Sequence, residues 1–153
     1  MNDKPTEELD KILENMKPSK LNSFINDNSD SLVNAEKAFY YYMKDKYLEK
    51  KIKLKDVYLL AGVSESYGGK ILRMEQKHSD DRDLIIRFCL VGRFNRIETN
   101  RALKLYGMSP LYAKDPRDAC IIVAINNRIF DLYEIDKILE EKGFNKITSD
   151  KEQ

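Results

Sequence analysis

The chain has 153 residues, about the size of a single domain. With 42% hydrophobic and 35% charged residues, it can bury a core and remain soluble. No apolar run approaches the roughly 18–20 residues of a membrane span, and the amino terminus lacks the apolar segment of a signal peptide. We therefore expect a cytoplasmic protein with no membrane contact.

The net charge is only +1, but it is spread unevenly along the chain. Residues 1–50 carry −2, residues 51–110 carry 12 basic against 7 acidic side chains, or +5, and residues 111–153 carry −2. A positive segment in an otherwise neutral chain is the asymmetry expected of a nucleic-acid binder. A solvated surface would produce the same modest excess, so the charge pattern leaves both interpretations open.

The first 30 residues are predicted to form a partly flexible amino-terminal arm. Apolar residues at helical spacing favour a short helix from Thr6 to Met16, which Pro18 breaks. The polar run 26–30 has the composition of a loop or linker. A single helical domain is expected to follow over residues 31–143.

Two short helices around one tight turn are predicted over residues 53–78, after a first long helix at 34–50. The first short helix ends at Ala61, Gly62 supplies the turn and Val63 is buried. Ser64 is an N-cap that begins a second helix running to about Arg73. This is the outline of a helix-turn-helix, whose second helix can lie in the major groove of DNA.

Four further helices are predicted between residues 79 and 143, because apolar residues at helical spacing follow four N-cap signals. The predicted N-caps are Ser79, Asn95, Asp115 and Asp131. Three of these helices would stop at glycines: Gly92, Gly107 and Gly143. The polar residues 144–153 are predicted to be a disordered tail. No segment alternates apolar and polar residues over strand length, so the predicted fold class is all-α.

Five helices between about Ala35 and Tyr106, the second and third of them short, resemble the DNA-binding domain of Cro/CI-type (XRE-like) helix-turn-helix regulators. The sequence is also similar to a poorly characterised family of small helix-turn-helix proteins from Gram-positive bacteria. That closer match covers residues 32–143 and is carried by Ala61-Gly62-Val63-Ser64, Ser66-Tyr67-Gly68, Ala102-Leu103-Lys104-Leu105-Tyr106-Gly107, Pro110-Leu111-Tyr112 and Arg117-Asp118-Ala119. The resemblance implies a lambda-repressor-like five-helix domain with two extra C-terminal helices.

The resemblance also implies double-stranded DNA as the partner, transcription regulation as the role, and the helix from Ser64 to Arg73 as the recognition helix. Phosphate contacts would come from basic residues in and around the unit at 54–73, and base edges would be met by Ser66 and Arg73. The candidate DNA-binding residues are Lys55, Ser64, Ser66, Lys70, Arg73 and Lys77.

Several residues depart from the pattern of these regulators. Leu54 stands where a phosphate-contacting glutamine is common, and Glu65 brings a negative charge to the tip of the recognition helix. Tyr58 replaces a small alanine, and Gly68 replaces an aliphatic anchor. We hypothesise that Tyr58 fills the space beside Gly68. The alternative to DNA binding is a packing module that serves as a protein–protein interaction adaptor.

Other chemistry finds little support in the sequence. No Gly-rich phosphate loop is present, and His78 is the only histidine, so neither an enzyme nor a metal or other cofactor is expected. Cys89 and Cys120 lie in apolar helical patterns and are predicted to be reduced, buried thiols. In the last two helices, Phe130 and Tyr133 would either dock a partner or a second copy of the chain, or complete the core.

Overall fold

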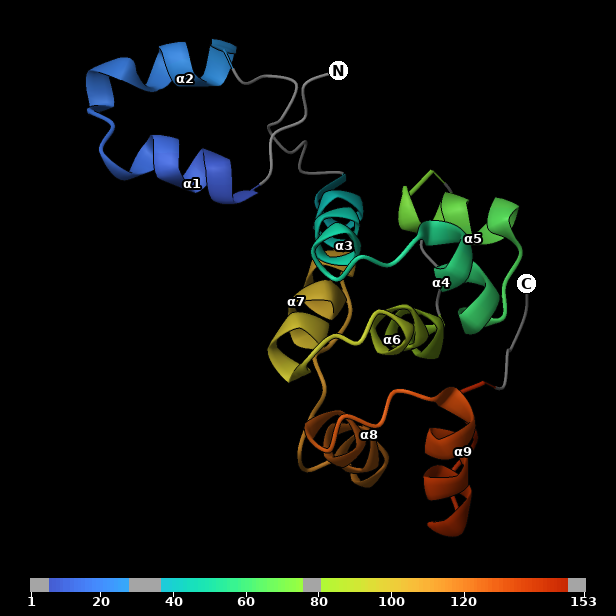
Figure 1. Cartoon of the computed structure of the whole chain (residues 1–153). Helices are drawn as coiled ribbons and strands as arrows, with labels where there is room; N and C mark the ends of the chain where they lie inside the picture. Colours follow the sequence, from blue (N-terminus) through green and yellow to red (C-terminus); the bar gives the residue numbers. More distant parts are fainter. Residues whose placement is uncertain (1–5, 28–36, 76–80, 149–153) are drawn as a thin grey trace.

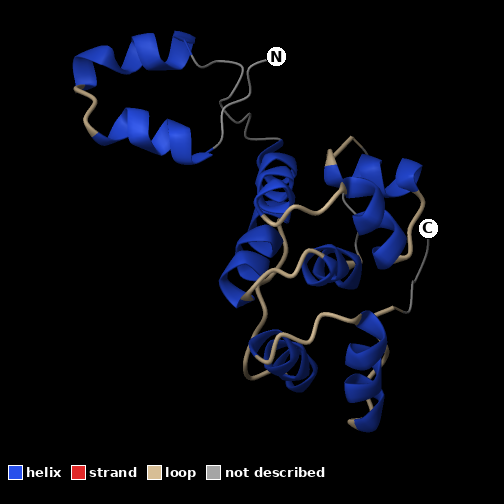
Figure 2. Cartoon of the chain, viewed as in Figure 1, coloured by secondary structure: helices blue, strands red, loops and turns tan. Residues whose placement is uncertain are grey.

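The computed structural model describes residues 6–27, 37–75 and 81–148, and within them every regular element is helical, so the all-α prediction is confirmed (Figures 1 and 2). A 3₁₀ turn at Pro18–Lys20 separates the first two helices. The α-helices are α1 (Thr6–Glu14), α2 (Leu21–Asp27), α3 (Ala38–Glu49), α4 (Leu54–Ala61), α5 (Glu65–Leu72), α6 (Arg82–Val91), α7 (Arg96–Tyr106), α8 (Pro116–Asn126) and α9 (Leu132–Glu141).

Helix α6 lies at the centre of the body formed by α3 to α9 (Figure 1). All of its residues from Leu84 to Val91 are buried, and α4, α7 and α9 pack against it. A helix that is apolar on nearly all sides is stable only when other elements surround it. The apolar run of α6 therefore explains why it occupies the middle of the domain.

Gly92 ends α6 as predicted. Its backbone φ of −84° is one that any residue adopts, so the backbone conformation does not require glycine. Close packing does. A Cβ at Gly92 would lie 2.6 Å from Cε1 of Tyr47 and 2.7 Å from Cε1 of Phe94. Both rings are buried, and the Tyr47 hydroxyl donates to the carbonyl of Phe88 at 2.8 Å. The glycine lets α3 and the α6–α7 loop approach the end of α6.

All seven helices from α3 to α9 end in the same backbone turn. One residue adopts a positive φ, and the next donates its N–H to the carbonyl five positions back, as in a Schellman motif. Glycine takes the positive φ in three cases, Gly62, Gly107 and Gly143, whereas Lys51, Met74, Arg93 and Arg128 take it in the others. The donor residue is apolar after six helices: Ile52, Val63, Phe94, Met108, Ile129 and Phe144. After α5 it is Glu75.

The predicted N-caps of α7, α8 and α9 are confirmed. Asn95 and Glu98 form a full capping box, Asp115 accepts from two backbone N–H groups of α8, and Asp131 accepts from the N–H of Tyr133. The predicted N-cap of α6 is wrong, because Asp81, whose side chain accepts from the N–H of Leu84, caps this helix. Ser79 itself lies outside the described residues. Several polar residues in a row can each cap a helix, so local chemistry does not select one of them.

The prediction of a disordered tail from residue 144 is wrong for residues 144–148. Ile147 is fully buried, and its N–H donates to Oδ1 of Asp136 at 2.7 Å. The Thr148 hydroxyl donates to the other carboxylate oxygen of Asp136 at 2.6 Å. Contacts with α9 and with the core hold this segment, and its apolar residues Phe144 and Ile147 were the available signal. Residues 149–153 lie outside the described residues.

The amino-terminal arm contains the predicted helix, α1, followed by α2, and Figure 1 shows the pair beside the body. No residue of α1 is buried, whereas Phe24 of α2 is. The hydroxyl of Thr6 donates to a carboxylate oxygen of Asp45 at 2.8 Å, which connects the start of α1 to α3.

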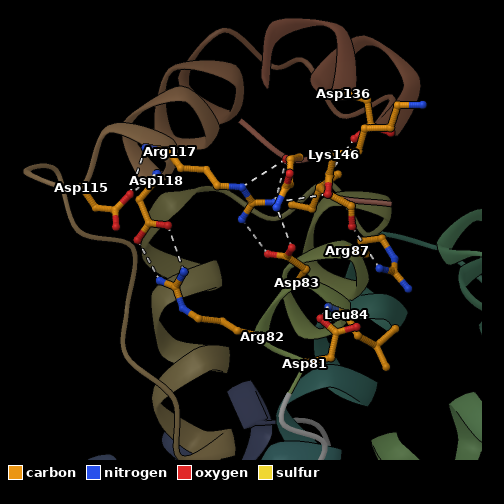
Figure 3. Close-up of polar contacts among 12 residues, drawn as sticks. Asp81, Arg82, Asp83, Leu84, Arg87, Asp115, Arg117, Asp118, Asp136 and Lys146 are labelled. Atoms are coloured by element: carbon orange, nitrogen blue, oxygen red, sulfur yellow. Dashed lines mark hydrogen bonds and ion pairs between the residues drawn. The ribbon is translucent and has the colours of Figure 1, made fainter. Parts of the chain in front are cut away.

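Two reciprocal arginine–carboxylate pairs join the start of α6 to the start of α8 (Figure 3). Arg82 donates to both oxygens of Asp118, each at 2.9 Å, and Arg117 donates to both oxygens of Asp83, each at 2.9 Å. Arg117 also donates to the carbonyls of Asn145 and Lys146, so the same pair holds the C-terminal segment. Bidentate pairs of this kind fix geometry as well as charge.

Asp118 is the most enclosed carboxylate of these pairs. Burial by itself would raise the pKa of Asp118, but hydrogen bonds from Arg82 and from the backbone N–H of Tyr112 outweigh burial and hold the pKa below its usual 3.8. The charges of Arg82 and Arg117 act in the same direction. A lowered pKa means that the ionised carboxylate stabilises the folded state.

Removing the charge of Asp118 should therefore destabilise the fold in a pH-dependent way. We expect Asp118→Asn to lower the free energy of unfolding at pH 7 by about 3 kcal/mol, because it leaves Arg82 without its carboxylate. The difference from wild type should be full above about pH 4 and vanish as the pH falls through the lowered pKa. Urea denaturation across this range tests it. Asp131→Asn is the matched control, since Asn caps a helix as well as Asp. An equal loss in both variants would contradict the assignment.

The non-glycine residues with positive φ at the ends of α3, α5, α6 and α8 give a second test. Arg93 is exposed, and its φ of 57° is strained for any residue with a Cβ. We expect Arg93→Gly to raise the free energy of unfolding by about 1 kcal/mol. The control Arg101→Gly, on the exposed face of α7, should lower it by a similar amount, because glycine weakens a helix interior. A loss of stability in both would show that Arg93 contributes a contact that outweighs its strain.

Candidate nucleic-acid interface

Helices α4 and α5 and the turn between them have the outline predicted from the sequence. Helix α4 ends at Ala61, Gly62 adopts a left-handed φ of 79°, and Ser64 caps α5 by accepting from the N–H of Tyr67 at 3.1 Å. Val63 is partly buried and packs against the core. Local chemistry therefore accounts for both helix ends and for the direction in which α5 begins.

Tyr58 fills the space beside Gly68, as hypothesised. A Cβ at Gly68 would lie 2.6 Å from Cδ1 of Tyr58 and 3.0 Å from Cγ2 of Val63, so any larger residue would collide. Tyr58 is itself buried between α4 and α5. The resemblance implies a small alanine at position 58 of α4 and an aliphatic residue at position 68 of α5. This protein has the reverse, with the large residue on α4 and the glycine on α5.

The predicted contact residues of α5 share one exposed face. Ser66, Lys70 and Arg73 recur at intervals of four and three, the spacing that aligns side chains on a helix. Ser66 and Lys70 are exposed and Arg73 is partly exposed, whereas Ile71 and Leu72 are buried on the other side. Exposed positions are also held by Lys55 in the first turn of α4, Ser64 at the cap and Glu65 beside it. Lys77 lies outside the described residues.

Arg73 folds back along α5 and does not extend from it. Its Nε donates to Oε2 of Glu75 at 3.0 Å. The guanidinium lies over Gly69, where a Cβ would be 2.8 Å from Nη1. The hydrogen bond from Arg73 lowers the pKa of Glu75, which therefore stays ionised, and the bond to Glu75 raises the pKa of Arg73.

The positive charge of residues 51–110 is only partly at the surface. Arg82 pairs with Asp118, and Arg87 is 1% exposed, so two of the twelve cations serve internal contacts. In contrast, Lys51 and Lys53 are both exposed just before α4 and add to the charge of Lys55. These two lysines were not among the predicted contact residues, although their alternating spacing with Lys55 was the available signal.

Arg87 is a further functional residue that was not among the predicted ones. It lies within the apolar run of α6, and its Nε donates to the carbonyl of Ala61, the last residue of α4, at 3.0 Å. Its Nη1 donates to the carbonyl of Ile147 at 3.0 Å. A cation inside an apolar helix was the signal. The Arg87 side chain positions the turn between α4 and α5 relative to the core.

The cysteines agree only in part with the prediction of buried thiols. Cys89 is fully buried, and burial raises the pKa of its thiol well above the ordinary value, whereas Cys120 is partly buried. Both are free thiols. Within the described residues, no cluster of histidine, cysteine and acidic side chains could hold a metal ion, and His78 lies outside those residues.

Phe130, in the loop before α9, and Tyr133, in α9, divide between core and surface. Phe130 is partly buried and packs against the core, with the Arg128 guanidinium 5.2 Å from its ring centre. Tyr133 is 68% exposed, and Nζ of Lys137 lies 4.9 Å from its ring centre. Phe130 thus completes the monomer, and Tyr133 is available to a partner.

Comparisons with protein-family models, with curated proteins and with solved structures returned no match. None of the helices in residues 6–27, 37–75 and 81–148 has the length and apolar character needed to cross a membrane. What the exposed face of α5 can bind must therefore be inferred from its own residues.

The two adjacent glycines of α5 provide a matched test of its packing. We expect Gly68→Ala to lower the melting temperature, because the new methyl group collides with buried Tyr58 at a cost of about 1–3 kcal/mol. Gly69→Ala should raise it, because the methyl group meets only the mobile end of Arg73 and alanine favours the helix by about 1 kcal/mol. Thermal unfolding followed by circular dichroism measures both. An increase for both variants would refute the Tyr58–Gly68 packing.

Proposed function

We propose that this protein binds double-stranded DNA through α5 and regulates transcription. The observation that carries the proposal is the exposed face of Ser66, Lys70 and Arg73 on a short helix whose opposite face is buried. A recognition helix needs these two properties together, since it must be held rigidly while its side chains enter the groove. The Arg87 contact to the turn before α5 supplies the rigidity.

Each contact residue has a role that follows from its chemistry. Lys70 and Arg73 would meet phosphate oxygens, and Arg73 or Ser66 at the groove edge would meet base acceptors. Lys55, with Lys51 and Lys53 before it, would approach the phosphate backbone from the start of α4. Ser64 would orient the tip of α5, and Lys77, which follows α5 in the sequence, would add a further phosphate contact.

The arrangement of α3 to α7 supports a lambda-repressor-like domain, with α8 and α9 as additional helices. Two long helices flank the α4–α5 unit in sequence, and α3 and α6 pack against it in space. In a cytoplasmic regulator, a homodimer would let two copies of α5 meet half-sites about one turn of DNA apart. Exposed Tyr133 on α9 would suit such an interface.

The second candidate function is a protein–protein interaction adaptor that uses the same helices without binding DNA. It is favoured by the exposed side chains of Tyr133 and Val123 on the two C-terminal helices. The negative charge of Glu65 at the tip of α5 also disfavours phosphate there. The two functions make opposite predictions about duplex binding.

A salt titration of duplex binding distinguishes them. We expect a fluorescent random-sequence duplex of about 20 base pairs to bind, and its affinity to fall about 100-fold between about 50 and 200 mM salt if about four phosphates are contacted. Lys70→Glu combined with Arg73→Glu should abolish binding. The control pair Lys104→Glu and Lys114→Glu makes the same charge change at exposed positions of α7 and the α7–α8 loop and should retain most of it. No binding at low salt would leave the adaptor as the function.

A further inference from the structure

The end of α5 holds one carboxylate among several cations. The Schellman turn brings the chain back, with Met74 at φ 57° and the N–H of Glu75 donating to the carbonyl of Lys70 at 3.0 Å. This turn fixes the Glu75 backbone beside the last turn of α5. The side chain remains at the surface, 44% exposed, paired with Arg73.

The identity of Glu75 is unusual for its position. The corresponding residue after the other six helices from α3 to α9 is apolar and packs against the core. An apolar side chain is the usual choice there, because it contacts the last turn of the helix it follows. At α5 alone, the same backbone turn places a charge beside the proposed DNA-binding face.

Cations at the end of α5 and at the start of α3 surround Glu75. The hydrogen bond from Arg73 lowers the pKa of Glu75 most, and the charges of Arg73, Lys37 and Lys70 lower it further. Lys37 is the residue that precedes α3, and α3 packs against α5. Three of these four side chains are cationic and one is anionic, so together they carry a net positive charge.

We infer that Lys37, Lys70 and Arg73 form a phosphodiester-binding seat that Glu75 occupies in the free protein and that a DNA phosphate takes over on binding. This inference rests on the proposed function and adds Lys37 of the α3 start to the interface. A carboxylate and a phosphate present the same kind of acceptor to a guanidinium, so one can replace the other on Arg73.

The geometry makes the exchange easy. The Arg73–Glu75 pair is exposed to water, and exposed ion pairs are weak, so little free energy opposes replacement of the carboxylate by a DNA phosphate. Gly69 leaves room for the guanidinium to rest along α5 in the free state. Glu75 thereby competes with DNA for Arg73 and reduces the affinity for phosphates of any sequence.

The test compares duplex binding of the full chain with that of Glu75→Gln, which keeps the shape of the side chain and removes its charge. We expect Glu75→Gln to bind the random-sequence duplex about two- to fivefold more tightly. The control Glu141→Gln makes the same change in net charge at the exposed end of α9 and should leave the affinity unchanged.

Two further variants test the other members of the seat. Arg73→Gln should weaken binding more in the Glu75→Gln background than in wild type, because Glu75 no longer neutralises Arg73 in the free protein. Lys37→Gln should reduce the slope of log affinity against log salt by about 0.9, the loss of one phosphate contact. The control Lys104→Gln, exposed on α7, should leave the slope unchanged.

The outcomes separate this inference from the proposed function. Duplex binding by wild type with no gain in Glu75→Gln, or an equal gain in Glu141→Gln, would overturn the seat and leave the DNA-binding function intact. Tighter binding by Glu75→Gln than by wild type, with Glu141→Gln unchanged, would support the seat. Absence of binding by both proteins at low salt would overturn the proposed function and the seat with it.

Discussion

The buried guanidinium of Arg87 connects the parts of this domain that matter for its proposed function. A charged group can remain in the interior only when hydrogen bonds replace its hydration. Arg87 obtains two of them from the carbonyls of Ala61 and Ile147, which lie at the end of α4 and in the C-terminal segment. The turn before α5 and the end of the described chain are thus held by one side chain of the central helix. Loss of either carbonyl partner would leave the cation less well solvated, so both segments are constrained together.

The same principle operates at the start of α6, where charge pairing organises the helices that follow the α4–α5 unit. Arg82 and Asp83 each pair with a residue of α8, and Arg117 extends the contact to the C-terminal segment. The charges in these pairs neutralise each other, so they contribute little to the electrostatic potential at the surface. The exposed cations near α5 therefore make up a larger share of the positive surface charge than the count of basic residues suggests. Glu75 accepts a hydrogen bond from Arg73 and so offsets part of that charge.

Much of the secondary structure could be predicted because it depends on neighbours in the sequence. The caps at Asn95, Asp115 and Asp131 need only a side chain within three residues of the N–H groups it satisfies. The helix ends at Lys51, Met74 and Arg128 have no glycine to signal them, and the turns at Lys51 and Arg128 are followed by apolar residues that pack against the core. The role of Gly92 was misjudged because Tyr47 approaches it from another helix. On the candidate interface, the exposed face of α5 was predictable from its periodicity, whereas the folded-back position of Arg73 was not.

The amino-acid sequence by itself determined that the chain is all-α, where most helices begin, and which residues share the outer face of α5. Those properties follow from capping chemistry and helical periodicity, which act over a few residues. Only the tertiary structure decided which charges are free and which are used. The Arg87 contact to Ile147 spans 60 residues, and the Arg82–Asp118 pair spans 36. Such pairings depend on how helices pack, so the order of residues 144–148 and the surface charge around α5 emerge only when the core has formed.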